Sequence, residues 1–231
     1  MIIFEHADFI VVNKPAPLLV HRHSRFPKEY PLLQQIRDKL GHYVWPIHRL
    51  DRQTSGCVIM ARRQELVFPL SRALQNGSKF YLALVRGRLT QEGAIEVNTA
   101  IKKSKSKYQE AHSTVWSLGH NEAPRCSLVQ AQAHTGRHHQ IRRHLRDLNH
   151  PILHDGDHGD SRVNRWWREE YGLSRLALHA YRIDIEYSNT THQFIAPFPQ
   201  DLMKIVKQLS WWPAIQSSHS IFSAQWTQKE S

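Results

Sequence analysis

A short polar loop, His48 to Gly56, lies between two apolar segments and constrains the fold more than any other stretch of the chain. Each flanking segment is short enough to be a buried strand. The loop carries one carboxylate, Asp51, between Arg49 and Arg52, and it ends in Thr-Ser-Gly, which favours a turn. Loops held between buried strands often carry catalytic residues. For this loop taken alone, the simpler interpretation is an Asp–Arg ion pair that fixes a surface turn.

Apolar periodicity elsewhere predicts further strands and helices along the chain. The predicted strands cover residues 2–4, 9–12, 79–87, 94–97, 112–118, 127–133, 175–187 and 193–195. The predicted helices cover residues 31–40, 63–75, 137–148, 162–171 and 202–209. Gly41 is expected to cap the first helix, and Pro69 to kink or break the second. We expect one catalytic domain over residues 1–213, and a flexible tail over 214–231, where the composition turns to Ser, Gln and Thr.

The charge balance points to a polyanionic partner. The chain has 31 Lys and Arg against 20 Asp and Glu, a formal net charge of +11. The basic residues are clustered in residues 102–107 and again in residues 137–146. Such clusters favour nucleic acid over a basic surface that serves only solubility. A helix lying on a membrane surface is a weaker alternative, because the first cluster has no apolar face.

The lack of a recognisable targeting signal, together with the small number of cysteines, predicts a reduced, cytoplasmic protein. No apolar run approaches the roughly 18 residues of a membrane span, and no signal peptide is recognisable at the N-terminus. The two cysteines, Cys57 and Cys126, form neither a C-x-x-C pair nor a disulfide framework. We therefore expect no membrane partner and no structural zinc.

The sequence also argues against metal and cofactor sites. The chain has 17 histidines, but no H-E-x-x-H pattern. The histidines closest in sequence are His21 and His23, and His134, His138 and His139. The loop that begins at Asp155 resembles the start of a calcium loop, but it lacks the later ligands. Without a phosphate-binding or dinucleotide motif, a reaction free of cofactors and metals is the expectation.

Five motifs occur in order along the chain. They are Asn13-Lys14-Pro15, the His48 to Gly56 loop, Lys79-x-Tyr81-x-Ala83-x-Val85-x-Gly87, the stretch Thr135 to Leu145 that runs on to His150-Pro151-Ile152, and Leu178-His179-Ala180. Together they resemble the RluA-type pseudouridine synthases over about residues 10–200. Two positions depart from the family pattern. Gln53 stands where proline is usual, and His154 stands where glycine is usual.

The resemblance implies a mixed α/β protein with the pseudouridine synthase fold: a bent, largely antiparallel sheet with flanking helices and a central active-site cleft. It implies an RNA-binding isomerase that converts a uridine to pseudouridine without a cofactor. The relatives that the chain most resembles act on tRNA, at the uridine of position 65. A ribosomal RNA target is the first alternative, and an RNA-binding protein without activity is the second. A metal-dependent hydrolase, which a chelator would inhibit, is the third. We expect a monomer with no obligate protein partner.

The resemblance also assigns catalytic roles. Asp51 is the expected nucleophile or base, and it must be ionised to act. The Arg142 guanidinium is expected nearby, because a cation favours the ionised carboxylate. Tyr81 is expected against the face of the uracil. Leu178 is expected to line the apolar side of the pocket.

Other basic residues are expected to bind the substrate RNA. A base inside a duplex must be flipped out before it can react, and Arg49 is expected to fill the vacated space or hold a phosphate. Lys14, Arg137 and Arg143 are expected phosphate contacts rather than catalysts. For each of them, a solvated basic surface is the alternative.

Overall fold

The computed structural model describes residues 1–104, 107–218 and 222, and the chain forms two compact units. The first unit comprises Met1–Lys79 and Ala180–Ala196, and the second comprises Phe80–His179 with the described residues from Pro197 onward. The prediction of a single catalytic domain over residues 1–213 stays a prediction. Among the described residues, no helix has the length and apolar character that a membrane crossing requires.

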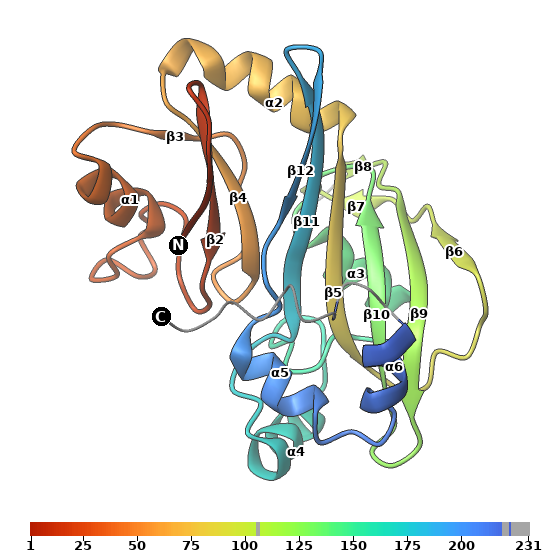
Figure 1. The fold of residues 1–231 in the computed structure, drawn as a ribbon. Helices are drawn as coiled ribbons and strands as arrows, with labels where there is room; N and C mark the ends of the chain where they lie inside the picture. The colour runs from red at the N-terminus through yellow and green to blue at the C-terminus, as the bar shows by residue number, and fades with distance from the viewer. Residues whose placement is uncertain (105–106, 219–221, 223–231) are drawn as a thin grey trace. The chain divides into compact units, whose positions relative to one another are not determined.

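The first unit is built on a sheet of short strands (Figure 1). In spatial order these are β1 (Ile2–Glu5), β2 (Phe9–Lys14), β4 (Ser55–Ala61) and β11 (Leu178–Tyr187), with β12 (Thr190–Ile195) paired to β11 and β3 (Trp45–Pro46) paired to β4. The pairs β1–β2, β2–β4, β3–β4 and β11–β12 are antiparallel. Three helices complete the unit: α1 (Leu32–Leu40), the 3-10 helix η1 (Gln64–Leu66) and α2 (Val67–Asn76).

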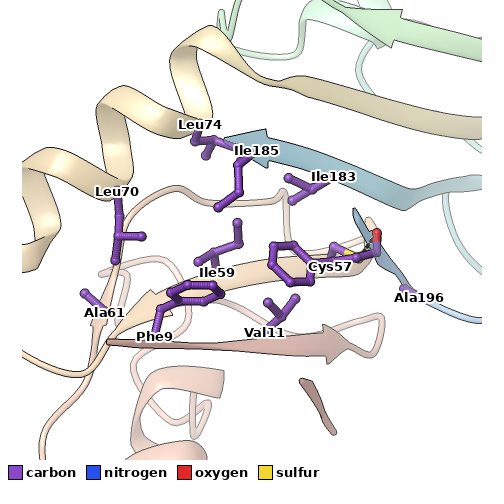
Figure 2. Packing of buried hydrophobic residues seen from close by; sticks show 11 residues of the cluster. Phe9, Val11, Cys57, Ile59, Ala61, Leu70, Leu74, Ile183, Ile185 and Ala196 are labelled. Atoms are coloured by element: carbon purple, nitrogen blue, oxygen red, sulfur yellow. Dashed lines mark hydrogen bonds between the residues drawn. The ribbon is translucent and has the colours of Figure 1, made fainter. Parts of the chain in front are cut away.

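Helix α2 covers one face of this sheet (Figure 2). Alternate residues of β2 and β4, such as Phe9 and Ile59, point to the same face because side chains alternate along a strand. Leu70 and Leu74 of α2 pack against them and against Ile185 of β11. Burying each of these side chains stabilises the unit by about 1.5–3 kcal/mol.

Helix α2 is not broken by its proline, contrary to the expectation. Pro69 is the third residue of α2, within the first helical turn. Amide groups there have no partner inside the helix, so a residue without an N–H is tolerated. By contrast, Gly41 caps α1 as expected, with a left-handed φ of 72° and an N–H that donates to the carbonyl of Arg37.

The second unit holds another run of strands. Their spatial order is β5 (Ser78–Arg86, whose first two residues belong to the first unit), β10 (Cys126–Ala133), β9 (Ser113–Asn121) and β6 (Ala94–Val97). The pairs β9–β10 and β6–β9 are antiparallel. The helices are α3 (Gln140–Asp147), α4 (Ser161–Tyr171), α5 (Gln200–Val206) and α6 (Trp212–Ser218). The predicted mixed α/β class, with a mostly antiparallel sheet and flanking helices, is confirmed.

Two segments of the second unit have structure that the sequence did not predict. Around the basic stretch, β7 (Ile101–Lys102) and β8 (Tyr108–Gln109) pair as a small hairpin. The chain is also helical beyond Pro213, because α6 extends to Ser218 and its residues Trp212 and Ile215 are buried. Most of the expected flexible tail falls on residues outside the described part of the chain.

Candidate active site

The loop that carries Asp51 is tied to the preceding Asn-Lys-Pro motif through backbone carbonyls. Asp51 itself is half-buried, and its carbonyl accepts the N–H of Thr54 at 3.0 Å. The Lys14 ammonium donates to the carbonyls of Leu18 at 2.7 Å and Arg52 at 3.2 Å. The Arg52 carbonyl also accepts the N–H of Leu18 at 2.9 Å. Residue 52, directly after the carboxylate, is thus held by two donors.

Lys14 therefore has a different position from the one expected. Its side chain is 0% exposed, and its ammonium also donates to the Pro15 carbonyl at 3.1 Å. An ammonium turned inward onto carbonyls does not contact a phosphate at the surface. The expectation of a phosphate contact at Lys14 is corrected: the residue positions the loop.

The side chain of Arg52 gives the loop a second anchor. Its Nε donates to Oε2 of Glu29 at 2.6 Å, while Oε1 of Glu29 accepts the N–H of Leu19 at 2.6 Å. Burial raises the pKa of Glu29, but these hydrogen bonds and the charge of Arg52 outweigh it, so the net pKa lies below the ordinary value. Glu29 therefore stays ionised and joins the loop to the chain before α1.

His48, the first residue of the loop motif, serves the sheet. Its Nε2 accepts the N–H of Ile59 at 3.0 Å, which fixes the neutral ring against β4. Burial, with a smaller contribution from the charge of Lys79, lowers the pKa of His48 to about 3. The ring is therefore a backbone acceptor near neutral pH.

Gly56 closes the loop at a point where no side chain fits. Its φ is +121°, and a Cβ built there would lie 2.1 Å from the carbonyl oxygen of Ala180 on β11. Glycine is required both for this conformation and for the close approach of the two strands. The motif glycine thus sets the distance between β4 and β11.

Arg49 lies on the outside of the same loop. The residue is exposed, and its Nη1 lies 3.4 Å from Nε2 of His21. The loop thus carries a half-buried aspartate and an exposed arginine that lies near His21, and the backbone at residue 52 is held from within. An exposed arginine on this loop is suited to contact RNA.

In the second unit, Arg142 is held by two carboxylates. Its Nε and Nη2 donate to the two oxygens of Asp155 at 2.8 and 2.7 Å, and Nη2 also donates to Asp157 at 2.6 Å. Asp155 is 1% exposed and also accepts the N–H groups of Asp157 and His158. Burial raises the pKa of Asp155, but Arg142 and these amides together hold it below its ordinary value. This bidentate pair fixes the plane of the guanidinium.

The other two predicted site residues, Tyr81 and Leu178, also belong to the second unit, which includes the first two residues of β11. Tyr81 is half-buried on β5, directly before the buried run Leu82–Val85. Leu178 is 4% exposed and is the first residue of β11. Its carbonyl accepts from Nη1 of Arg175 at 3.4 Å, and Arg175 is itself held by Asp201.

The segment before α3 is a turn rather than helix. Helix α3 begins at Gln140, because His139 adopts a left-handed φ of 55°, so Arg137 lies outside the helix. The Arg137 N–H donates to Oε1 of Gln140, and its Nε donates to the carbonyl of Glu110 at 2.9 Å. Arg143, within α3, donates to the carbonyl of Lys102 in the β7–β8 hairpin at 3.0 Å. Both arginines remain proposed RNA contacts, although each also has a structural bond.

Three residues with clear roles were not identified from the sequence. Asp155 was considered only as part of a calcium loop, whereas it orients Arg142. Gln140 accepts from Thr135 and donates to the carbonyl of His112, and so shapes the turn before α3. Glu29 has no motif around it. For Asp155, the usable signal was a carboxylate shortly after a helix rich in arginine.

His154 shows how the chain accommodates a departure from the family pattern. The residue stands where glycine is usual, and it adopts a φ of 60°. Left-handed backbone costs a residue with a side chain roughly 1–2 kcal/mol. The N–H of His154 donates to Oδ1 of Asn164 at 2.9 Å, which helps to hold this turn beside Asp155.

Two bacterial enzymes are similar in sequence to this chain over most of its length. The tRNA pseudouridine synthase C of Pasteurella multocida (strain Pm70) is 36% identical over 234 residues, covering 91% of this chain and 96% of the relative. The enzyme of the same name from Vibrio vulnificus (strain CMCP6) is 35% identical, covering 84% of this chain and 88% of the relative.

Solved structures agree in fold. Human RNA Pseudouridylate Synthase Domain Containing 1 has a TM-score of 0.70 at 24% identity, covering 86% of this chain and 83% of its own. Human RNA Pseudouridylate Synthase Domain Containing 4 has a TM-score of 0.71 at 20% identity, covering 90% and 92%. The RNA pseudouridylate synthase family itself matches residues 8–147, which include the Asp51 loop and the turn before α3. The chain belongs to the RNA pseudouridylate synthase family.

Proposed function

We propose that the chain is an isomerase that converts a uridine of tRNA to pseudouridine without a cofactor, and that its target is the uridine of position 65. The substrate proposal is supported by the relatives named tRNA pseudouridine synthase C, which align over nearly their whole length. A monomer in the cytoplasm is the state in which we propose that it acts. Ribosomal RNA is the alternative substrate.

The observation that carries the proposal is the bracing of the Asp51 loop. The reaction detaches uracil from ribose, turns it and rejoins it through C5, with loss of the C5 proton. A carboxylate that acts as nucleophile or base must stay in place while the base moves. The bonds from Lys14 and from the Arg52 side chain hold the residue next to Asp51, which leaves Asp51 half-buried at the loop's edge.

We assign the remaining roles by the motif matches. Arg142 is the proposed catalytic arginine, with its guanidinium oriented by Asp155. Tyr81 stacks on the detached uracil, and Leu178 lines the apolar side of the pocket. These roles rest on the family motifs, and each can be tested by substituting the residue.

The RNA contacts are proposed from charge and, for Arg49, also from exposure. Arg49 is exposed on the catalytic loop, where it takes the space of the flipped nucleotide or binds its phosphate. Arg137 and Arg143 flank the start of α3 and offer guanidinium groups to the RNA backbone. Lys14 is not among the proposed contacts, because its ammonium is buried.

The test is tritium release from RNA labelled at uridine C5. Wild type, Asp51→Asn and the control Asp38→Asn, an exposed aspartate of α1, are compared on three RNAs: tRNA, the same tRNA with cytidine at position 65, and ribosomal RNA. We expect release from unaltered tRNA alone, and its loss in Asp51→Asn only. RNA affinity of this variant should stay within about tenfold, because phosphate contacts dominate binding.

Each other outcome has a distinct meaning. Release from the cytidine-65 tRNA would refute the position but keep the activity. Release from ribosomal RNA alone would refute the substrate class. Full release by Asp51→Asn would refute the role of that carboxylate, and binding without any release would favour the RNA-binding alternative.

A further inference from the structure

Three neighbouring strands of the second unit place two histidines and a glutamate on one face of the sheet. Glu96 of β6 pairs with Thr114 of β9. His112 precedes Thr114 by two residues and therefore points to the same side. His134 follows the last residue of β10, and its N–H donates to the carbonyl of His112 at 3.0 Å. The set is thus assembled from segments far apart in the sequence.

The side chains converge on one point. Nε2 of His112 lies 2.5 Å from Oε2 of Glu96, and the Thr114 hydroxyl lies 3.2 Å from the same oxygen. Nε2 of His134 lies 2.7 Å from that hydroxyl, and the two imidazole rings are stacked with centroids 4.3 Å apart. One possible ligand atom from each of Glu96, His112 and His134 lies within 4.8 Å of the others.

We propose that Glu96, His112 and His134 bind one divalent transition-metal ion, and that Zn²⁺ is the ion they suit best. Two imidazole nitrogens and a carboxylate form a common protein ligand set for zinc, at about 2.0–2.2 Å from the ion. Tetrahedral ligands at such distances are about 3.3–3.5 Å apart, so small side-chain rotations suffice. Glu96 and His134 are exposed, which leaves the fourth position to water.

The site lies where it would affect the turn before α3. The carbonyl of His112 accepts from Nε2 of Gln140 at 2.9 Å, and its N–H donates to the Thr135 hydroxyl at 3.1 Å. A metal that bridges His112 and His134 would close the base of the turn that carries Arg137. Zinc is therefore expected to reduce hydrogen exchange of the amides in residues 134–140.

The test is zinc binding by the full chain after removal of metal with a chelator. Affinity is measured by competition with a chromophoric chelator, and geometry by the visible absorption of Co²⁺ bound in its place. Variants His134→Ala and Glu96→Gln are compared with His120→Ala, the control. His120 lies on β9, and its Nε2 is 3.9 Å from Oε1 of Glu122.

We expect one zinc ion per chain, and affinity at least about tenfold weaker in His134→Ala and Glu96→Gln, as for the loss of groups that hold a metal. His120→Ala should stay within about twofold of wild type. Circular dichroism without metal checks that each variant folds. No binding by wild type would overturn the proposal. So would equal binding by wild type and His134→Ala, since the ion would then lie at other histidines.

Discussion

Replacing Lys14 with methionine separates two roles that a lysine in this motif can have. In the structure its ammonium is buried and donates to the carbonyls of Pro15, Leu18 and Arg52. Methionine fills a similar volume but donates nothing. If Lys14 is an internal brace, the variant loses stability and misplaces the loop that carries Asp51. If it is a phosphate contact, the variant loses RNA affinity instead.

The expected loss of stability follows from the three acceptors. The Arg52 carbonyl keeps its bond from the N–H of Leu18, and the Pro15 residue is exposed to water. The Leu18 carbonyl is left without the ammonium, and an unsatisfied buried acceptor costs about 1–3 kcal/mol. The variant also removes a buried positive charge, whose burial is itself unfavourable, and this recovers part of the lost stability. We therefore expect a net loss of about 1–2 kcal/mol, or roughly 2–8 °C in the unfolding midpoint.

The assay combines thermal unfolding with RNA binding at several salt concentrations. Each lost phosphate contact reduces the slope of log affinity against log salt by about 0.7–0.9. For Lys14→Met we expect an unchanged slope, a lower midpoint and much slower tritium release. Lys28→Met, at an exposed position, is the control and should change neither stability nor turnover. A reduced slope with an unchanged midpoint would refute the brace.

Three further substitutions test the site. Gly56→Ala would place a Cβ 2.1 Å from a backbone carbonyl, so soluble yield and unfolding midpoint should both fall, and wild-type stability would contradict the close approach. Asp155→Ala leaves the buried Arg142 without its bidentate partner, at a cost of about 3–5 kcal/mol in denaturant unfolding; a loss below about 1 kcal/mol would show that the pair is unimportant. The pKa of His48 is about 3 in the folded state, so the unfolded state binds more protons below about pH 6.5. The free energy of unfolding should therefore decrease as the pH is lowered from about 6 to 4, by up to about 1.4 kcal/mol per pH unit. His48→Gln keeps an acceptor for the Ile59 N–H but does not titrate, so a slope identical to that of wild type would exclude this cause.

The fold was predictable wherever a local pattern decides the structure. Strand periodicity located β6 at its exact bounds, 94–97, and glycine chemistry predicted the end of α1 at Gly41. The errors arose from a misplaced helix start and from partners distant in the sequence. Pro69 is tolerated only because α2 begins two residues earlier. Helix α3 begins late because His139 is left-handed and Gln140 bonds to residues far away in the sequence.

For the site, the sequence offers a set of candidate residues but not the residues that support them. Family motifs predict Asp51 and Arg142, and their roles stay predictions. They did not show which way a charged side chain points, and Lys14 was assigned to the surface on its charge alone. Nor did they identify Glu29 or Asp155, since ion-pair partners separated by 23 and 13 residues leave no local pattern.

The direction of each charge explains how one short loop can be both fixed and open to RNA. Arg49 and Arg52 flank Asp51 at nearly equal distances in sequence, yet one is exposed and the other is anchored to Glu29. Catalysis on a moving base needs a carboxylate whose position does not depend on the RNA, whereas recognition needs a cation that is free to adjust. The buried Lys14 contributes to the first requirement. The net charge of +11 therefore overstates the positive charge at the surface, because part of it holds the Asp51 loop from inside.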